Sequence, residues 1–148
     1  MKLSDYIDSL KNRSVAVVGA GISNMPLIRL LAANNIDLTV CDRRGRESIA
    51  GSGTEFPDNI KLELGETYLD NLNQDIIFRT PGLMPFDKHL LKAKENGSII
   101  TSEMEVFFSV CPCKTVAITG SDGKTTTSTL ISLLLHDAGY NVHLGGRR

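Results

Sequence analysis

The stretch Val15-Ala16-Val17-Val18-Gly19-Ala20-Gly21-Ile22-Ser23-Asn24 decides the fold of this 148-residue chain. Its first four residues are small or β-branched and apolar, which predicts a short buried strand, and the glycines predict a tight turn after it. Residues 23–34 follow, with Leu27, Leu30 and Leu31 at helical spacing. A strand, a glycine-rich turn and a helix in this order begin a βαβ unit, from which parallel sheets are built.

The alternation of strands and helices continues to residue 110. Further strands are predicted at residues 37–41, 60–64, 75–79 and 98–101. Further helices are predicted at residues 86–96 and 103–110. The polar residues 43–59 are expected to form a loop with at most one turn of helix. This pattern predicts an α/β fold, with a Rossmann-like, mostly parallel sheet and helices on both of its faces.

Composition and charge argue against several classes of protein. Hydrophobic residues make up 41% of the chain and charged residues 22%, as in an ordinary globular protein. A net charge of −1 argues against a dedicated binder of nucleic acid or of membrane surfaces. The chain has no run of 18 apolar residues, and its acidic N-terminus does not resemble a signal peptide. We therefore expect a cytoplasmic protein with neither nucleic acid nor a membrane as its partner.

The turn after the first strand is similar to the dinucleotide-binding pattern G-x-G-x-x-G, with Asn24 in place of the third glycine. Asp42 follows the second strand, where an acidic side chain binds a ribose in NAD enzymes. A helix N-terminus also offers N–H groups and partial positive charge to a phosphate. We therefore predict nucleotide binding, with NAD(P) or a nucleotide-diphosphate sugar as the ligand. Asn24 argues against NAD, and a purely structural βαβ turn is the alternative.

A second glycine-rich loop has the sequence Ile118-Thr119-Gly120-Ser121-Asp122-Gly123-Lys124-Thr125-Thr126-Thr127. A strand is predicted before it at residues 115–118, and a helix after it at residues 124–138. Backbone N–H groups, an ammonium and a hydroxyl in this order suit a nucleoside triphosphate with Mg²⁺. The loop lacks the first glycine of the pattern G-x-x-x-x-G-K-[ST], which would fall at Ile118. An ordinary strand–turn–helix connection is the alternative.

The segment Cys111-Pro112-Cys113-Lys114 interrupts the alternation and is the expected domain boundary. Residues 1–112 hold five predicted strands, which is enough for one nucleotide-binding domain. Residues 113–148 begin a second α/β unit, whose second strand is predicted at residues 140–144. In the first domain, the turn Thr80-Pro81-Gly82-Leu83 follows a strand, and Gly82 permits a ligand to approach the backbone closely. The sequence leaves a ligand contact and a plain turn equally open here.

Taken together, four motifs resemble the Mur ligase family. They are Gly19-Ala20-Gly21-Ile22-Ser23, Asp42-Arg43-Arg44, Thr80-Pro81-Gly82-Leu83 and Thr119-Gly120-Ser121-Asp122-Gly123-Lys124-Thr125-Thr126. The absent first glycine of the phosphate loop is typical of this family. The chain most resembles the members that use ATP and Mg²⁺ to join D-glutamate to UDP-N-acetylmuramoyl-L-alanine in peptidoglycan biosynthesis. A member that uses a different amino acid is the closest alternative.

The resemblance implies a role for each motif. Residues 1–112 would be the UDP-substrate-binding domain, with contacts from Ile22, Ser23, Asp42, Arg43, Arg44 and Gly82. Residues 113–148 would begin the central ATP-binding domain, with phosphate contacts from Gly120, Ser121, Asp122, Gly123, Lys124, Thr125 and Thr126. In catalysis, Lys124 would neutralise charge on the transferred phosphoryl group, and Thr125 would bind Mg²⁺.

Full members of the family have three domains, so the resemblance implies a fragment that cannot complete the reaction. Where the family has a Gly-Gly-Asn-type turn, this chain has Gly145-Gly146-Arg147. Two alternatives from other classes stay open: an NAD(P)-binding redox or regulatory module, and a nucleotide sensor without catalysis. The Lys124 loop argues against the redox module, because a dehydrogenase has no use for a triphosphate loop.

Overall fold

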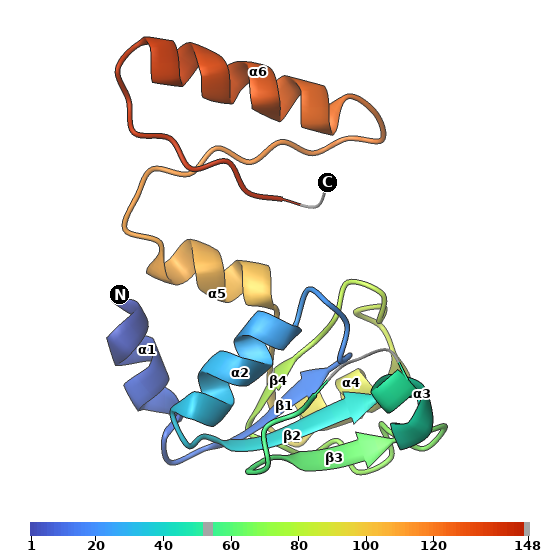
Figure 1. The fold of residues 1–148 in the computed structure, drawn as a ribbon. Helices are drawn as coiled ribbons and strands as arrows, with labels where there is room; N and C mark the ends of the chain where they lie inside the picture. The colour runs from blue at the N-terminus through green and yellow to red at the C-terminus, as the bar shows by residue number, and fades with distance from the viewer. Residues whose placement is uncertain (52–54, 147–148) are drawn as a thin grey trace. The chain divides into compact units, whose positions relative to one another are not determined.

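The computed structural model describes residues 1–51 and 55–146. The chain divides into two compact units, Met1–Pro112 and Cys113–Arg148 (Figure 1). Arg147, where the resemblance leads us to expect Asn, lies outside the described residues.

A five-stranded sheet forms the centre of the first unit. Its strands are β1 (Ser14–Val18), β2 (Asp37–Asp42), β3 (Lys61–Leu64), β4 (Ile76–Phe78) and β5 (Ile99–Thr101). They lie in the order β3-β2-β1-β4-β5, and every neighbouring pair is parallel. This order is that of one half of the Rossmann fold plus the first strands of the other half. The predicted parallel, Rossmann-like sheet is therefore confirmed.

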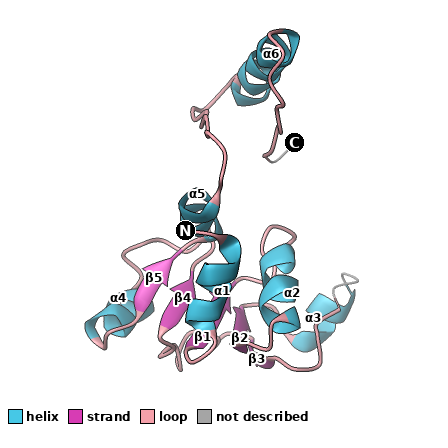
Figure 2. Ribbon diagram, turned by 90° about the vertical axis from the view of Figure 1, so that its left-hand side faces the viewer, coloured by secondary structure: helices cyan, strands magenta, loops and turns pink. Residues whose placement is uncertain are grey.

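Helices cover both faces of the sheet (Figures 1 and 2). The first face is covered by α1 (Leu3–Leu10) and α2 (Met25–Ala33), and α5 (Glu103–Val110) contributes Val106 to the same cluster. The second face is covered by α4 (Lys88–Glu95). The short helix α3 (Arg46–Gly51) follows β2 along the chain.

Successive residues of β1 divide the core between these two faces. Val15 and Val17 pack with the side chains of α1 and α2, whereas Ala16 and Val18 pack with those of α4. All four residues are at most 1% exposed. A central parallel strand is buried on both faces, which explains why β1 has a continuous apolar sequence instead of an alternating one.

Two helices of the first unit differ from the expectations. No helix is predicted at residues 3–10, although Ile7 and Leu10 of α1 lie three positions apart and are both buried. That spacing is the sequence signal for an amphipathic helix. The signal is weak because α1 has only eight residues, which give the pattern little room to repeat. In the region 43–59, α3 has six residues, which is more than the single turn expected.

The second unit holds one helix, α6 (Lys124–Asp137), which confirms the helix predicted at residues 124–138. The strands predicted at residues 115–118 and 140–144 are wrong, because neither segment is a strand in the structure. A strand needs ladder hydrogen bonds to a neighbour, and no residue in the described part of this unit supplies them. The described part of the second unit therefore consists of loops and one helix, without the predicted strands.

The apolar side chains of α6 are at most partly covered in this unit. No residue of this fully described helix is buried, and Leu130, Leu133 and Leu134 are each more than half exposed. None of the helices in the described ranges is long and apolar enough to cross a membrane.

Candidate functional site

The loops after β1, β2 and β4 leave the same edge of the sheet. All strands are parallel, so their carboxyl ends share one edge. The chain runs from β1 outward to β2 and β3 on one side, and returns to β4 and β5 on the other. Open α/β sheets bind ligands at the carboxyl edge where the strand order reverses in this way. The predicted UDP-contact residues lie in the loops at residues 19–24, 42–44 and 80–83, which are these three loops.

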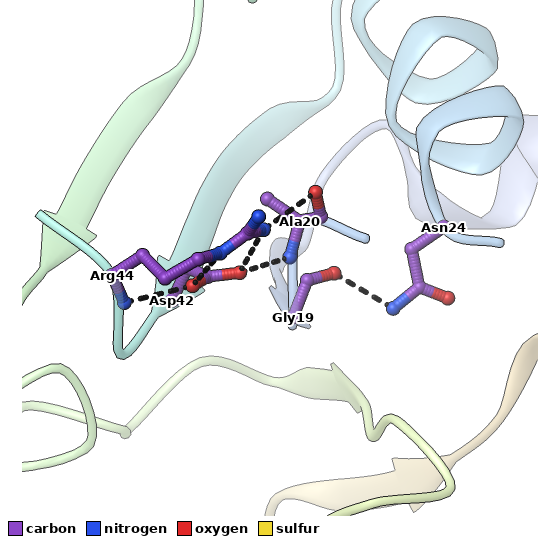
Figure 3. A network of polar contacts seen from close by, with 5 residues as sticks. All are labelled: Gly19, Ala20, Asn24, Asp42 and Arg44. Carbon is purple, nitrogen blue, oxygen red and sulfur yellow. Dashed lines mark hydrogen bonds and ion pairs between the residues drawn. The ribbon is translucent and has the colours of Figure 1, made fainter. Parts of the chain in front are cut away.

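Asp42, the last residue of β2, is the centre of the polar contacts at this edge (Figure 3). Its Oδ2 accepts hydrogen bonds from the Ala20 N–H at 2.7 Å and from Nη2 of Arg44 at 3.0 Å. Its Oδ1 accepts from the N–H of Arg44 at 2.9 Å and from Nε of Arg44 at 3.0 Å. Nη2 of Arg44 also donates to the Ala20 carbonyl at 3.1 Å. These bonds join the loop after β1 to the loop after β2.

The Asp42 carboxylate is ionised, and donors of the protein occupy all of its acceptor positions. Burial would raise the pKa of Asp42, but the hydrogen bonds from Arg44 and from the Ala20 N–H lower it below its usual value. The same pairing raises the pKa of the Arg44 guanidinium. A carboxylate offers about four acceptor positions, and four protein donors occupy them here. A direct contact between Asp42 and a ribose therefore stays a prediction.

Asn24 joins the start of α2 to the end of β1. Its side-chain amide donates to the carbonyls of Gly19 at 2.8 Å and Val18 at 3.2 Å, and the residue is only 6% exposed. In the dinucleotide-binding pattern, a glycine at this position allows the helix to pack closely on the strand. Here an amide makes the same junction through hydrogen bonds, a role that the pattern comparison does not reveal.

Gly19 brings the loops after β1 and β4 together. Its φ is +92°, a conformation that favours glycine, and a Cβ at this position would lie 3.2 Å from Cβ of Thr80. A side chain at Gly19 would therefore push the two loops apart. At Gly21 and Gly82 a Cβ would meet no atom within 4 Å, so the packing of the chain itself does not require glycine there.

Three consecutive backbone N–H groups near the start of α2 are without a protein acceptor within the ranges that the structure describes. They belong to Gly21, Ile22 and Ser23. The neighbouring donors are used, because the Ala20 N–H bonds to Asp42 and the Asn24 N–H bonds to the carbonyl of Gly21. All three residues are exposed, and Ile22 is 95% exposed. Unpaired N–H groups at a helix N-terminus are suited to bind an anion such as a phosphate.

The loop before α6 also has the features of an anion site. Gly120 and Gly123 have φ values of +145° and +72°, which favour glycine. The ammonium of Lys124 donates to the carbonyls of Gly120 at 2.6 Å and Ser121 at 2.9 Å, so it lies against the loop. Among the described residues, the N–H groups from Ser121 to Thr126 have no protein acceptor. The described ranges contain no cluster of three or more His, Cys, Asp or Glu that could hold a metal ion.

Replacing Asp42 with Asn should lower the free energy of unfolding by about 2 kcal/mol at pH 7, because hydrogen bonds to a charged group are lost. The pKa of Asp42 is lower in the folded state, so its stabilising effect is present above the unfolded pKa of about 3.9 and disappears as the pH falls through the folded value. Urea denaturation of the wild type and of Asp42→Asn should therefore show a smaller difference in the free energy of unfolding at pH 3 than at pH 7. Asp8→Asn, at an exposed ion pair, is the matched control. A difference that is equal at both pH values would contradict this account of Asp42.

Comparison with known proteins indicates the family of this chain. Residues 13–102 match the family described as Mur ligase MurD-like, N-terminal domain. The chain is 47% identical over 145 residues to the UDP-N-acetylmuramoylalanine–D-glutamate ligase of Clostridium novyi (strain NT), covering 97% of this chain and 32% of that protein. It is 48% identical over 147 residues to the enzyme of the same name from Acetivibrio thermocellus, covering 98% of this chain and 32% of that protein.

The chain thus spans 32% of the length of these curated relatives. Among solved structures, a shikimate dehydrogenase from Aquifex aeolicus is similar with a TM-score of 0.46 and 18% identity, over 78% of this chain and 54% of that one. The family match begins before β1 and ends after β5, so it includes the whole sheet and the three loops at its carboxyl edge. The chain belongs to the MurD-like family of Mur ligases.

Proposed function

We propose that this chain is the UDP-substrate-binding part, and the opening of the ATP-binding part, of a ligase that adds D-glutamate to UDP-N-acetylmuramoyl-L-alanine. In this reaction, ATP phosphorylates the carboxylate of the alanine. This step forms ADP, and the amine of D-glutamate then attacks the acyl phosphate, which yields the amide and releases phosphate. The curated relatives bear the name of this activity. The observation that carries the proposal is the run of three unpaired N–H groups beside Asp42 and Arg44.

The diphosphate of the substrate would bind at the start of α2. The N–H groups of Ile22 and Ser23 would donate to its oxygens, and the hydroxyl of Ser23 would add a further donor. The positive end of the helix dipole lies at the same place and favours the negative charge. Since Gly21 has no side chain and has open space around it, the diphosphate can approach the backbone.

The nucleoside end would bind at the end of β2. Arg43 is exposed, and the side chain of Arg44 is 41% exposed while Asp42 holds its guanidinium in place. Both arginines can therefore reach a ligand. We assign Asp42 the role of fixing Arg44, since a direct contact with ribose would require one of its four present donors to leave. The open space around Gly82 gives the ligand room along the loop after β4.

The same carboxylate argues against an NAD(P)-binding module. In such modules the acidic side chain after the second strand accepts hydrogen bonds from the ribose hydroxyls. Here those acceptor positions of Asp42 are taken by Arg44 and Ala20. The position of the third glycine is taken by Asn24, whose amide is hydrogen-bonded to the carbonyls of Val18 and Gly19.

The loop before α6 would bind the phosphates of ATP through the backbone from Gly120 to Thr126. On binding, the ammonium of Lys124 would exchange the carbonyls of Gly120 and Ser121 for the transferred phosphoryl group. The hydroxyl of Thr125 would bind the Mg²⁺ that accompanies ATP. The proposal assigns D-glutamate no contact among the described residues, so we expect the 148-residue chain alone to have no ligase activity.

Calorimetric titration should detect binding of UDP-N-acetylmuramoyl-L-alanine to the wild-type chain. Arg43→Ala should weaken this binding about tenfold, which is about 1.4 kcal/mol, by removing an exposed cation beside the nucleoside. Arg29→Ala, at an exposed position of α2, is the matched control and should bind as the wild type does. NAD should be titrated in parallel. Binding of NAD without binding of the UDP compound would overturn the proposal in favour of a redox module.

Equilibrium dialysis with Mg-ATP tests the second loop separately. The wild-type chain should retain Mg-ATP, and Lys124→Ala should lose most of this binding because the loop loses its cation. Lys92→Ala, an exposed lysine of α4, should behave as the wild type. If Lys124→Ala bound Mg-ATP as well as the control, the proposed role of the loop in phosphate binding would be wrong.

A further inference from the structure

The peptide group between Gly19 and Ala20 is held by the protein at both of its ends, and we call it the clamped peptide. Its N–H, on Ala20, donates to Oδ2 of Asp42 at 2.7 Å. Its carbonyl, on Gly19, accepts a hydrogen bond from the side-chain amide of Asn24 at 2.8 Å (Figure 3). The carbonyl and the N–H of a planar trans peptide point in opposite directions, so these two bonds together fix the orientation of its plane.

The next two peptide groups along the chain are held at their carbonyl ends. The carbonyl of Ala20 accepts from Nη2 of Arg44 at 3.1 Å, and the carbonyl of Gly21 accepts from the N–H of Asn24 at 3.0 Å. The N–H groups of the same two peptides, on Gly21 and Ile22, point away from these held carbonyls. They have no acceptor among the described residues. The protein therefore sets the direction of these N–H groups itself, in a stretch that starts at the clamped peptide.

Asn24 uses its side chain on this loop instead of on its own helix. It is the N-cap of α2, where an asparagine ordinarily accepts a hydrogen bond from an N–H of the first turn, but no such bond is present. Pro26, in that turn, has no N–H to donate. The Asn24 amide points back instead, to the carbonyls of Gly19 and Val18. Both partners are acceptors, so the nitrogen of the amide, and not its oxygen, must face them.

Burial makes the bonds of the Asn24 amide hard to replace. Asn24 is 6% exposed and Val18 is 1% exposed, so water has little access to this junction. A buried carbonyl that loses its donor costs free energy comparable to a lost hydrogen bond. Without the amide, the clamped peptide would gain by turning its carbonyl toward solvent, which the freedom of Gly19 permits. The N–H of Ala20 would turn with it and leave Asp42.

We propose that Asn24 is a positioning residue of the UDP-substrate site. By holding the clamped peptide, it keeps the unpaired N–H groups of residues 21–23 aimed at the diphosphate. The inference rests on the proposed function, which makes the diphosphate the ligand of these groups. Asn24 is buried and acts through the backbone. A glycine at this position, as in the dinucleotide-binding pattern, gives close packing of helix and strand but has no amide to hold the peptide.

The test is the affinity of Asn24→Ala and Asn24→Gly for UDP-N-acetylmuramoyl-L-alanine, measured by calorimetry under conditions where urea denaturation shows each variant to be folded. Both should bind about tenfold more weakly than the wild type, the scale of one hydrogen bond. Asn34→Ala is the matched control, because the Asn34 amide also donates to a backbone carbonyl, that of Leu30 at 2.8 Å, but at the other end of α2. This control should lose stability and keep the wild-type affinity.

Hydrogen exchange, followed by nuclear magnetic resonance, separates positioning from a merely structural role. The Ala20 amide should exchange faster in Asn24→Ala than in Asn34→Ala, because the clamped peptide turns away from Asp42. In the wild type, the side-chain amide of Asn24 should be protected from exchange with and without the UDP compound, a result that does not depend on the folding of any variant.

The outcomes distinguish this inference from the proposed function. Wild-type affinity in both Asn24 variants, or an Asn24 amide that exchanges freely in the wild type, would overturn this inference alone. An equal loss of affinity in Asn34→Ala would do the same, because the effect would then be one of general stability. No binding of the UDP compound to the wild type would overturn the proposed function, and this inference with it.

Discussion

The buried carboxylate of Asp42 fixes the two loops on which the candidate site depends. The parallel ladder aligns β1 with β2, and beyond it the N–H of Gly19 bonds to the carbonyl of Cys41 at 2.7 Å. From there, the bonds of Asp42 to Ala20 and Arg44 set the course of both loops. Because the Ala20 N–H is turned toward Asp42, the next three N–H groups along the chain are left for a ligand.

This arrangement separates two uses of the same fold. An acidic residue after the second strand of a Rossmann-like sheet can accept hydrogen bonds from a ribose, or it can bind a neighbouring cation and hold it in place. Asp42 does the second, since Arg44 bonds to both of its oxygens. In the proposed function, a guanidinium held in this way would meet the ligand as a fixed donor. The start of α2 would then bind the phosphates, and Arg43 and Arg44 would line the nucleoside end of the site in place of a free carboxylate.

The sequence predicts the sheet well, because buried parallel strands are continuous apolar runs and glycines mark their ends. It fails where pairing decides the outcome: residues 115–118 and 140–144 are apolar enough for strands but have no neighbour in the described unit. Within the site, Asp42 is predicted as a ligand contact, yet its bond to Ala20 spans 22 residues and depends on the folded sheet. Outside the site, the contact of His89 in α4 with Asp70, which lies between β3 and β4, likewise has no local pattern, because the two residues meet only in the tertiary structure.

The most direct test is the set of backbone amide resonances of residues 19–24 during titration with UDP-N-acetylmuramoyl-L-alanine. The account predicts that the amides of Gly21, Ile22 and Ser23 shift strongly, while the Ala20 amide keeps its position and stays protected from exchange by its bond to Asp42. The opposite result would be a strong shift and loss of protection at Ala20 with no change at Gly21 to Ser23. It would mean that the ligand binds by displacing Asp42, and that this carboxylate does not organise the site.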